Sequence, residues 1–164
     1  MSFLRSCRAA LAAAPLLLAI VGASPAFANI EAGLKALQAN DVTTAEKELQ
    51  PAAKDRDPRA QFLLGLYVYG NPNSKLFDLN KGAPMLLDAA ERGYAPAMVP
   101  LAGAYADGKG VPKSIYDSMK WMLLAERWNV PNTAPLIEQL SKELKPEEIE
   151  KARAEAAAFT FKTK

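Results

Sequence analysis

Apolar residues recur along this chain with the spacing of amphipathic helices, and short polar turns separate the apolar segments. In one segment Ala60, Leu63, Leu64, Tyr67 and Val68 fall at i, i+3, i+4, i+7 and i+8, on one face of a helix. The apolar positions of the other segments are Ile30, Leu34 and Leu37; Val42, Ala45, Leu49 and Ala52; Leu86, Leu87, Ala89 and Ala90; Ala97, Leu101, Ala104 and Tyr105; Met119, Met122 and Leu123; Leu136, Ile137, Leu140 and Leu144; Ile149, Ala152, Ala156 and Phe159. The pattern predicts an all-α protein.

Capping residues stand at the predicted helix starts. Asp41, Asp78 and Ser114 each precede a periodic segment, where a side-chain oxygen accepts hydrogen bonds from the free amides of the first turn. Gly93 is placed to end the helix before it, and the turn 107–110 carries two glycines that tolerate positive φ. The three caps are 37 and 36 residues apart. We therefore expect helix pairs of nearly equal length.

Two stretches of the chain repeat each other. Residues 60–69 return at 97–106, 37 residues later, whereas positions in 78–89 return in 114–125, 36 residues later. We place the one-residue difference in the loop between residues 70 and 77. Self-similarity at a fixed period of this length is typical of stacked helical repeats, which mostly bind other proteins.

Small residues occupy related positions in the repeats. Ala52, Ala89 and Ala125 lie in the second helices of the predicted pairs, and Ala60 and Ala97 lie in the first helices. Small side chains allow helix axes to approach closely, and regular apolar spacing usually indicates core. We expect these alanines to pack between helices.

The repeated motifs resemble the Sel1-like repeat, a relative of the tetratricopeptide repeat. The resemblance rests on Asp57-Pro-Arg-Ala-Gln-Phe-Leu-Leu-Gly-Leu-Tyr67, on 89–97, on Tyr105-Ala-Asp-Gly-Lys-Gly-Val-Pro112, and on Lys120-Trp121 with Ala125. The structural repeat positions that it marks are Ala60, Leu64, Gly65, Ala89, Gly93, Ala97, Leu101, Tyr105, Gly108, Gly110, Trp121 and Ala125. Tyr105 and Trp121 match packing positions of the family, so we expect both in the core.

The resemblance implies a right-handed superhelical solenoid of stacked antiparallel helix pairs with a C-terminal helical cap. The predicted units are a tetratricopeptide-like pair at 29–56, Sel1-like repeats at 57–94 and 95–130, and capping helices at 131–164. It also implies an adaptor that holds a partner protein in a groove lined by the first helix of each pair.

Two prolines depart from the family pattern. Pro84 and Pro100 fall inside predicted helices, where a proline removes an amide donor and crowds the preceding turn, at about 3 kcal/mol in a true helix interior. Either these helices kink, or they begin later than the family pattern suggests.

The first 28 residues have the layout of a secretory signal peptide. Arg5 and Arg8 precede the apolar run 9–23, and Ala26-Phe27-Ala28 matches a small-x-small cleavage site. The run is shorter than the roughly 20 residues of a spanning helix. We expect cleavage after Ala28, no stable membrane anchor afterwards, and a periplasmic protein, with secretion from the cell as the alternative.

Charge and composition exclude several classes of function. The predicted leader holds two of the 20 basic residues, none of the 18 acidic ones and the single cysteine, so the remainder has a formal net charge of zero. A nucleic-acid partner is therefore not expected. The chain has no histidine, and the remainder has no cysteine, which excludes Ser-His-Asp or Cys-His catalysis and the usual zinc ligands. We expect no enzyme, no cofactor and no metal.

Other candidate chemistry has simpler explanations. The acids Glu147, Glu148, Glu150 and Glu155 fit a solvated helix start better than a catalytic pair. The turn 107–110 lacks the full phosphate-loop pattern and a preceding strand.

Three aromatic residues in or beside loops are the candidate partner-binding residues: Tyr69, Phe77 and Tyr94. Exposed aromatic side chains are enriched in binding hot spots, although contact between neighbouring repeats would also account for them. We expect a monomeric adaptor or regulator that binds another protein of the cell envelope. The alternative is a structural subunit of an envelope, polysaccharide or secretion assembly; a carboxylate-dependent cell-wall enzyme is a remote second alternative.

Overall fold

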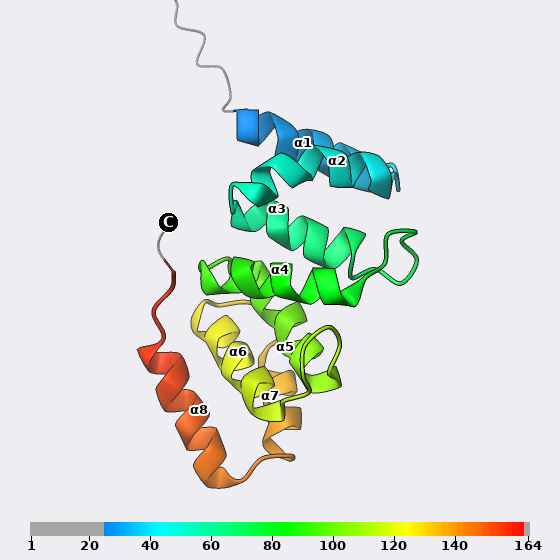
Figure 1. Cartoon of the computed structure of the whole chain (residues 1–164). Helices are drawn as coiled ribbons and strands as arrows, with labels where there is room; N and C mark the ends of the chain where they lie inside the picture. The colour runs from blue at the N-terminus through cyan, green and yellow to red at the C-terminus, as the bar shows by residue number, and fades with distance from the viewer. Residues whose placement is uncertain (1–24, 163–164) are drawn as a thin grey trace, which may run out of the picture.

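The computed structural model describes residues 25–162 and shows successive helices packed in antiparallel pairs, one pair upon the next (Figure 1). The elements are α1 (Pro25–Gln38), α2 (Val42–Lys54), α3 (Pro58–Leu63), the π-helical turn η1 (Leu64–Val68), α4 (Leu79–Glu91), the 3₁₀ turn η2 (Ala95–Ala97), α5 (Met98–Asp107), α6 (Ile115–Arg127), α7 (Ala134–Ser141) and α8 (Pro146–Ala158). The prediction of an all-α helical repeat solenoid is confirmed.

The predicted caps start the second helix of each pair. Asp41 accepts a hydrogen bond from the Thr44 amide at 3.1 Å, and Asp78 accepts one from the amide of Asn80 at 3.1 Å. Ser114 Oγ accepts one from the Asp117 amide at 3.0 Å. Each bond satisfies a backbone donor that the first turn leaves free.

The ends of these helices also repeat. Arg56, Gly93 and Asn129 follow α2, α4 and α6, and all three have left-handed backbone conformations, with φ of 61°, 82° and 55°. The non-glycine residue Arg56 forms an ion pair with Asp88 of α4 at 3.4 Å, which links the first pair to the second.

The buried side chains form two clusters along the stack. One lies between α1, α2, α3 and η1, and the other runs from α4 to α8. The five alanines expected to pack between helices are all buried, as are Leu64, Leu101 and Trp121, whereas Tyr105 is half-buried. Gly65 and Gly82 bring η1 and α4 closest, since a Cβ built on either would lie 2.8 Å from the carbonyl oxygen of the other.

The extra residue of the earlier repeat lies in its first helix, which corrects the loop assignment between residues 70 and 77. The Asp78 amide donates to the Tyr69 carbonyl, and the Ser114 amide donates to the Tyr105 carbonyl, both at 2.9 Å, so the two loops have equal length. The Tyr69 amide in turn donates to the Leu64 carbonyl, five residues back, at 2.9 Å. A π-helical turn absorbs one added residue within a helix, so Tyr69 corresponds to Tyr105.

The prolines are accommodated in different ways. The α-helical part of the third pair begins only at Met98, after the 3₁₀ turn, so Pro100 falls in a first turn where an amide donor is not needed. Pro84 remains inside α4, and Pro51 inside α2. Of the two sequence alternatives, a later helix start is therefore correct for Pro100.

The C-terminal segment returns along the stack after α8. The Lys145 amide donates to the Glu148 carboxylate at 2.9 Å and caps the start of α8. Beyond its end, Phe159 packs against Trp121, and the Lys162 amide donates to the Glu91 carbonyl of α4 at 2.7 Å. The described C-terminal segment thus reaches the level of α4 (Figure 1).

The predicted signal peptide lies mostly outside the described residues, which begin at Pro25. The predicted cleavage point after Ala28 falls inside α1. Cleavage there would leave Asn29–Gln38 of this helix.

Adding a methyl group at Gly82 should destabilise the fold. Gly82→Ala places a Cβ 2.8 Å from a backbone oxygen of η1, and we expect overpacking to cost about 1–3 kcal/mol, more than the gain of up to about 1 kcal/mol in helix propensity. Gly103→Ala is the matched control, because a Cβ there meets nothing within 4 Å and should be neutral or stabilising. Urea unfolding of both variants measures the difference; equal stabilities would contradict the close approach.

Candidate functional site

Exposed apolar side chains gather on the first helices of the pairs. The large apolar residues that the described structure leaves exposed are Leu34 (40%), Tyr67 (46%), Phe77 (44%), Trp128 (49%) and Leu136 (38%). Of these, Leu34 lies on α1, Tyr67 on η1 and Leu136 on α7, each within the first helix of its pair. Sequence periodicity placed these three on the apolar stripes of their helices, and the structure leaves all three exposed.

Three hollows follow one another along these helices. The first, of about 320 Å³, is lined by Leu34, Leu37, Gln38, Phe62, Leu63 and Tyr67. The second, of about 200 Å³, is lined by Gly65, Leu66, Gly70, Leu79, Ala83, Leu86, Pro100, Gly103, Ala104 and Lys109. The third, of about 210 Å³, is lined by Val99, Gly103, Ala106, Ser118, Met122, Leu136, Gln139 and Leu140. Leu66, which lines the second hollow, directly precedes Tyr67, which lines the first, and Gly103 lines both the second and the third. We therefore call the three hollows together the first-helix groove.

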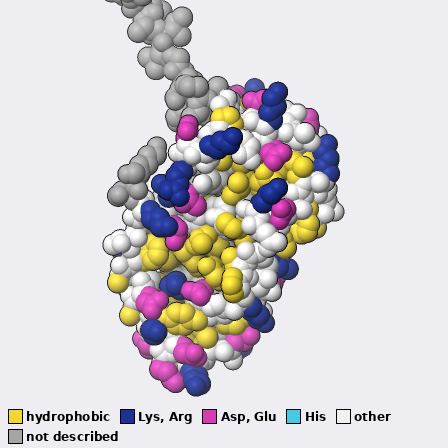
Figure 2. Space-filling model, viewed as in Figure 1, with side chains coloured by type: hydrophobic (Ala, Val, Ile, Leu, Met, Phe, Trp, Pro, Cys, Tyr) yellow, Lys and Arg dark blue, Asp and Glu magenta, His cyan; other side chains and the backbone are white. Residues whose placement is uncertain are grey.

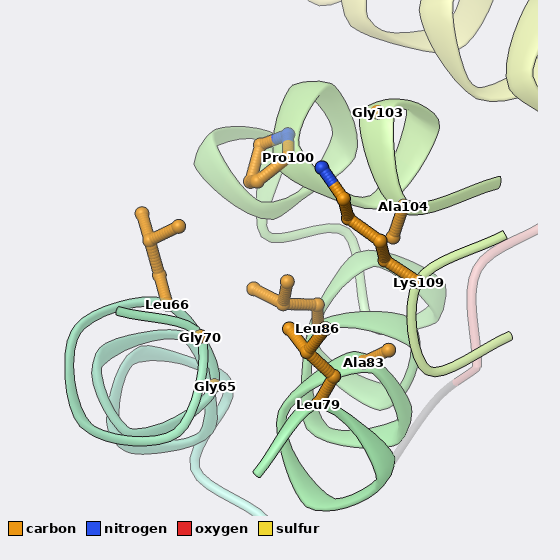
Figure 3. Close-up of a pocket in the computed structure, with 10 residues that line it drawn as sticks. All are labelled: Gly65, Leu66, Gly70, Leu79, Ala83, Leu86, Pro100, Gly103, Ala104 and Lys109. Carbon is orange, nitrogen blue, oxygen red and sulfur yellow. The ribbon is translucent and has the colours of Figure 1, made fainter. Parts of the chain in front are cut away.

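Gly103 leaves room in the middle of the groove. Figure 3 shows Gly65 and Gly70 on one side of the second hollow and Gly103 on the other, with Leu86 between the helices. A Cβ at Gly103 would have no heavy atom within 4 Å. The backbone is therefore accessible here, and a bulky side chain from outside could enter.

The groove carries little charge. Lys109 is the single charged residue among those that line the three hollows, and its ammonium pairs with the Asp107 carboxylate at 2.7 Å. On the face of the molecule shown in Figure 2, basic and acidic side chains are interspersed between apolar areas. The groove therefore suits an uncharged, apolar segment.

Tyr69 does not lie on an exposed binding face, which corrects its assignment as a partner-binding residue. Its side chain is only 3% exposed, and its hydroxyl donates to Glu46 Oε1 at 2.5 Å and accepts from Gln50 Nε2 at 3.0 Å. Burial and the contact with the Glu46 carboxylate raise the pKa of Tyr69 to about 12. This tyrosine fastens η1 to α2.

The other two candidate aromatics lie apart from Tyr69. Tyr94 is half-buried, and its ring packs on that of Phe62, which lines the first hollow, with centroids 5.2 Å apart. Phe77 is exposed in the loop before α4. The structure thus brings the three residues to three different surroundings, and partner binding by Phe77 and Tyr94 stays a prediction.

The π-helical turn explains why Tyr69 is buried and Tyr67 is exposed. An α-helical register carries Tyr67 inward after Leu63 and Leu64, but the additional residue in the turn rotates it to the groove and brings Tyr69 to the core. The signal was present in the repeat, because Tyr105 was assigned to the core and occupies the position equivalent to Tyr69.

Residues 25–162 contain no group of three or more Asp, Glu, Cys or His side chains that could hold a metal ion. No helix in this range is long and apolar enough to cross a bilayer. Glu147 and Glu148 lie in the first turn of α8, where they complement the helix dipole.

The stability contributed by Tyr69 should fall at alkaline pH. Its folded-state pKa lies above the ordinary value of 10.0, so the unfolded chain releases the phenolic proton first, and the free energy of unfolding should decrease from about pH 10 to pH 12. Tyr69→Phe should cost about 1 kcal/mol at pH 7 through the lost hydrogen bonds and should reduce this decrease. Urea unfolding of the wild type and of Tyr69→Phe at pH 7, 10 and 12 measures both effects. Tyr67→Phe, at an exposed tyrosine, is the neutral control at pH 7.

Comparison with known proteins identifies the fold. Searches of protein-family models and of curated proteins found no match to this chain. Among solved structures, the chain is similar to a protective antigen present in uropathogenic Escherichia coli strains, whose crystal structure displays an SLR (Sel1-like repeat) fold. The TM-score is 0.74 at 22% sequence identity, over 82% of this chain and 29% of the antigen chain, so the chain spans less than a third of that protein. The protein therefore has the Sel1-like repeat fold.

Proposed function

We propose that this protein is a non-enzymatic adaptor or regulator that holds another protein in its first-helix groove. The observation that carries the proposal is the row of three apolar hollows, with Leu34, Tyr67 and Leu136 exposed beside them. Exposed apolar surface of this kind marks interaction sites, and stacked repeats present such surfaces repeatedly along their length.

The groove is suited to a partner with regularly spaced apolar side chains. Its hollows recur between successive first helices, so side chains of one partner segment could enter successive hollows. Tyr67 lines the first hollow and offers a large, stiff contact surface, as hot-spot tyrosines do. Because Lys109 is already paired, the interaction should depend little on salt.

The predicted signal peptide supports a function in the cell envelope. Export with cleavage after Ala28 would deliver the protein to the periplasm, and secretion from the cell is the alternative. An adaptor should be a soluble monomer that melts cooperatively. A structural subunit, the competing proposal, should aggregate when purified without its assembly.

Site-specific photocross-linking tests which surface meets the partner. A photoreactive phenylalanine analogue replaces Tyr67 in one protein and Phe77 in another, since these aromatic residues have nearly equal exposures of 46% and 44%. In the producing cells, binding in the groove predicts that one envelope protein is cross-linked from position 67 and not from position 77, whereas partner binding by Phe77 predicts the opposite. The reverse result would favour the loop surface and contradict the groove.

A second variant fills the groove without changing its charge. Gly103→Leu should occupy the space beside the second and third hollows and abolish the cross-link from position 67. Gly103→Ala, which adds one methyl group to the same open space, should weaken it little. Persistence of the cross-link in Gly103→Leu, with an unchanged melting temperature, would show that the partner binds elsewhere.

A further inference from the structure

Trp128 stands at a position where the other repeats carry charged residues. It directly follows α6, as Arg92 follows α4 and Asp55 follows α2, and the three helices each have 13 residues. Arg92 forms an ion pair with Asp88 at 3.0 Å, whereas Trp128 keeps 49% of its surface exposed. Packing common to the repeats therefore does not account for a tryptophan at this place.

The ring of Trp128 forms one wall of an aromatic corner. The ring of Phe161 stands almost perpendicular to it, at 88°, with centroids 5.2 Å apart. Phe161 packs in turn on Phe159, and Phe159 packs on the buried Trp121, with centroids 5.2 Å and 5.4 Å apart. This series of contacts anchors the corner to the core, so its aromatic surfaces are held in place before any ligand binds.

Two planar polar side chains flank the tryptophan. Arg127 is held in position because its Nη1 donates to the Ala156 carbonyl at 3.1 Å and to the Ala157 carbonyl at 2.9 Å. Asn129 has a left-handed backbone with φ of 55°, and its backbone N–H donates to the Glu126 carbonyl at 2.9 Å. Arg127, Trp128, Asn129, Phe159 and Phe161 together line a hollow of about 450 Å³.

We propose that this hollow, at the C-terminal end of α6, binds a saccharide, either neutral or bearing a carboxylate. A pyranose ring presents an apolar C–H face that can stack on an aromatic ring, and its neighbouring hydroxyls match the paired donors of a guanidinium and the donor and acceptor of an amide. A carboxylate on the sugar would be met by Arg127.

Other ligand classes fit this lining less well. A wholly apolar ligand would remove Arg127 and Asn129 from water without replacing their hydrogen bonds. A cationic ligand could stack on the rings but would face the positive Arg127, and no acidic side chain lines the hollow. The site is separate from the first-helix groove, since they share no lining residue.

Ligand titrations test the proposal with defined oligosaccharides. Chitotetraose, cellotetraose and tetragalacturonate are each titrated at up to millimolar concentration into the whole protein, with binding followed by isothermal calorimetry and by ligand saturation-transfer NMR. We expect at least one to bind and to shift the tryptophan fluorescence, to which Trp128 is the exposed contributor of the chain's two tryptophans.

Substitutions then locate the binding. Trp128→Ala should weaken it about tenfold or more, as truncation of a central aromatic anchor does, while Trp128→Phe should retain part of it. Tyr67→Ala, in the first-helix groove, is the control and should leave saccharide affinity unchanged. A melting temperature for each variant verifies folding.

Three results would overturn the proposal. The first is that none of the three oligosaccharides binds. The second is that folded Trp128→Ala binds an oligosaccharide as tightly as the wild type does. The third is that uridine monophosphate binds more tightly than any of the oligosaccharides, which would indicate a nucleotide site instead. None of these depends on whether a protein occupies the first-helix groove.

Discussion

The contact of two backbones at Gly65 and Gly82 sets how closely the two helices of the second pair pack, and the stack is built from such closely packed pairs. Each glycine lies where a Cβ would meet the other's carbonyl oxygen at 2.8 Å, so η1 and α4 approach more closely than side chains would permit. The equivalent positions in the next pair are the buried Ala102 and Ser118. Small residues at this crossing therefore allow the two helices within each of these pairs to pack closely.

Much of the fold could be predicted because the second helices keep uninterrupted periodicity and begin at strong caps. Val42, Ala45, Leu49 and Ala52 form one apolar stripe in the sequence, and all four are buried. The first helices were harder, since helical spacing alone identifies a face and not what covers it. Leu34 and Leu136 fit their apolar stripes, yet their neighbours leave them partly uncovered.

The candidate site could be predicted only as a location. A groove along the first helices followed from the family resemblance. Which tyrosine faces the groove depends on a π-helical turn, and no residue type in the sequence predicts such a turn. Because of the one added residue in this turn, Tyr67 lies exposed in the groove and Tyr69 lies buried in the core. The hollow beside Trp128 was also beyond prediction, because it requires the C-terminal segment to return across α6.

That returning segment changes how the stack should unfold. In a simple solenoid each repeat contacts only its neighbours, so stability is a sum of local terms and the ends can fray one repeat at a time. Here Phe159 lies on α6 and Lys162 bonds to the end of α4, across two helix pairs. Separation of the C-terminal cap must therefore also break contacts with α6 and with the end of α4. Opening of the C-terminal cap should consequently cost more free energy in hydrogen exchange than the fraying of a terminal repeat that contacts only its neighbour.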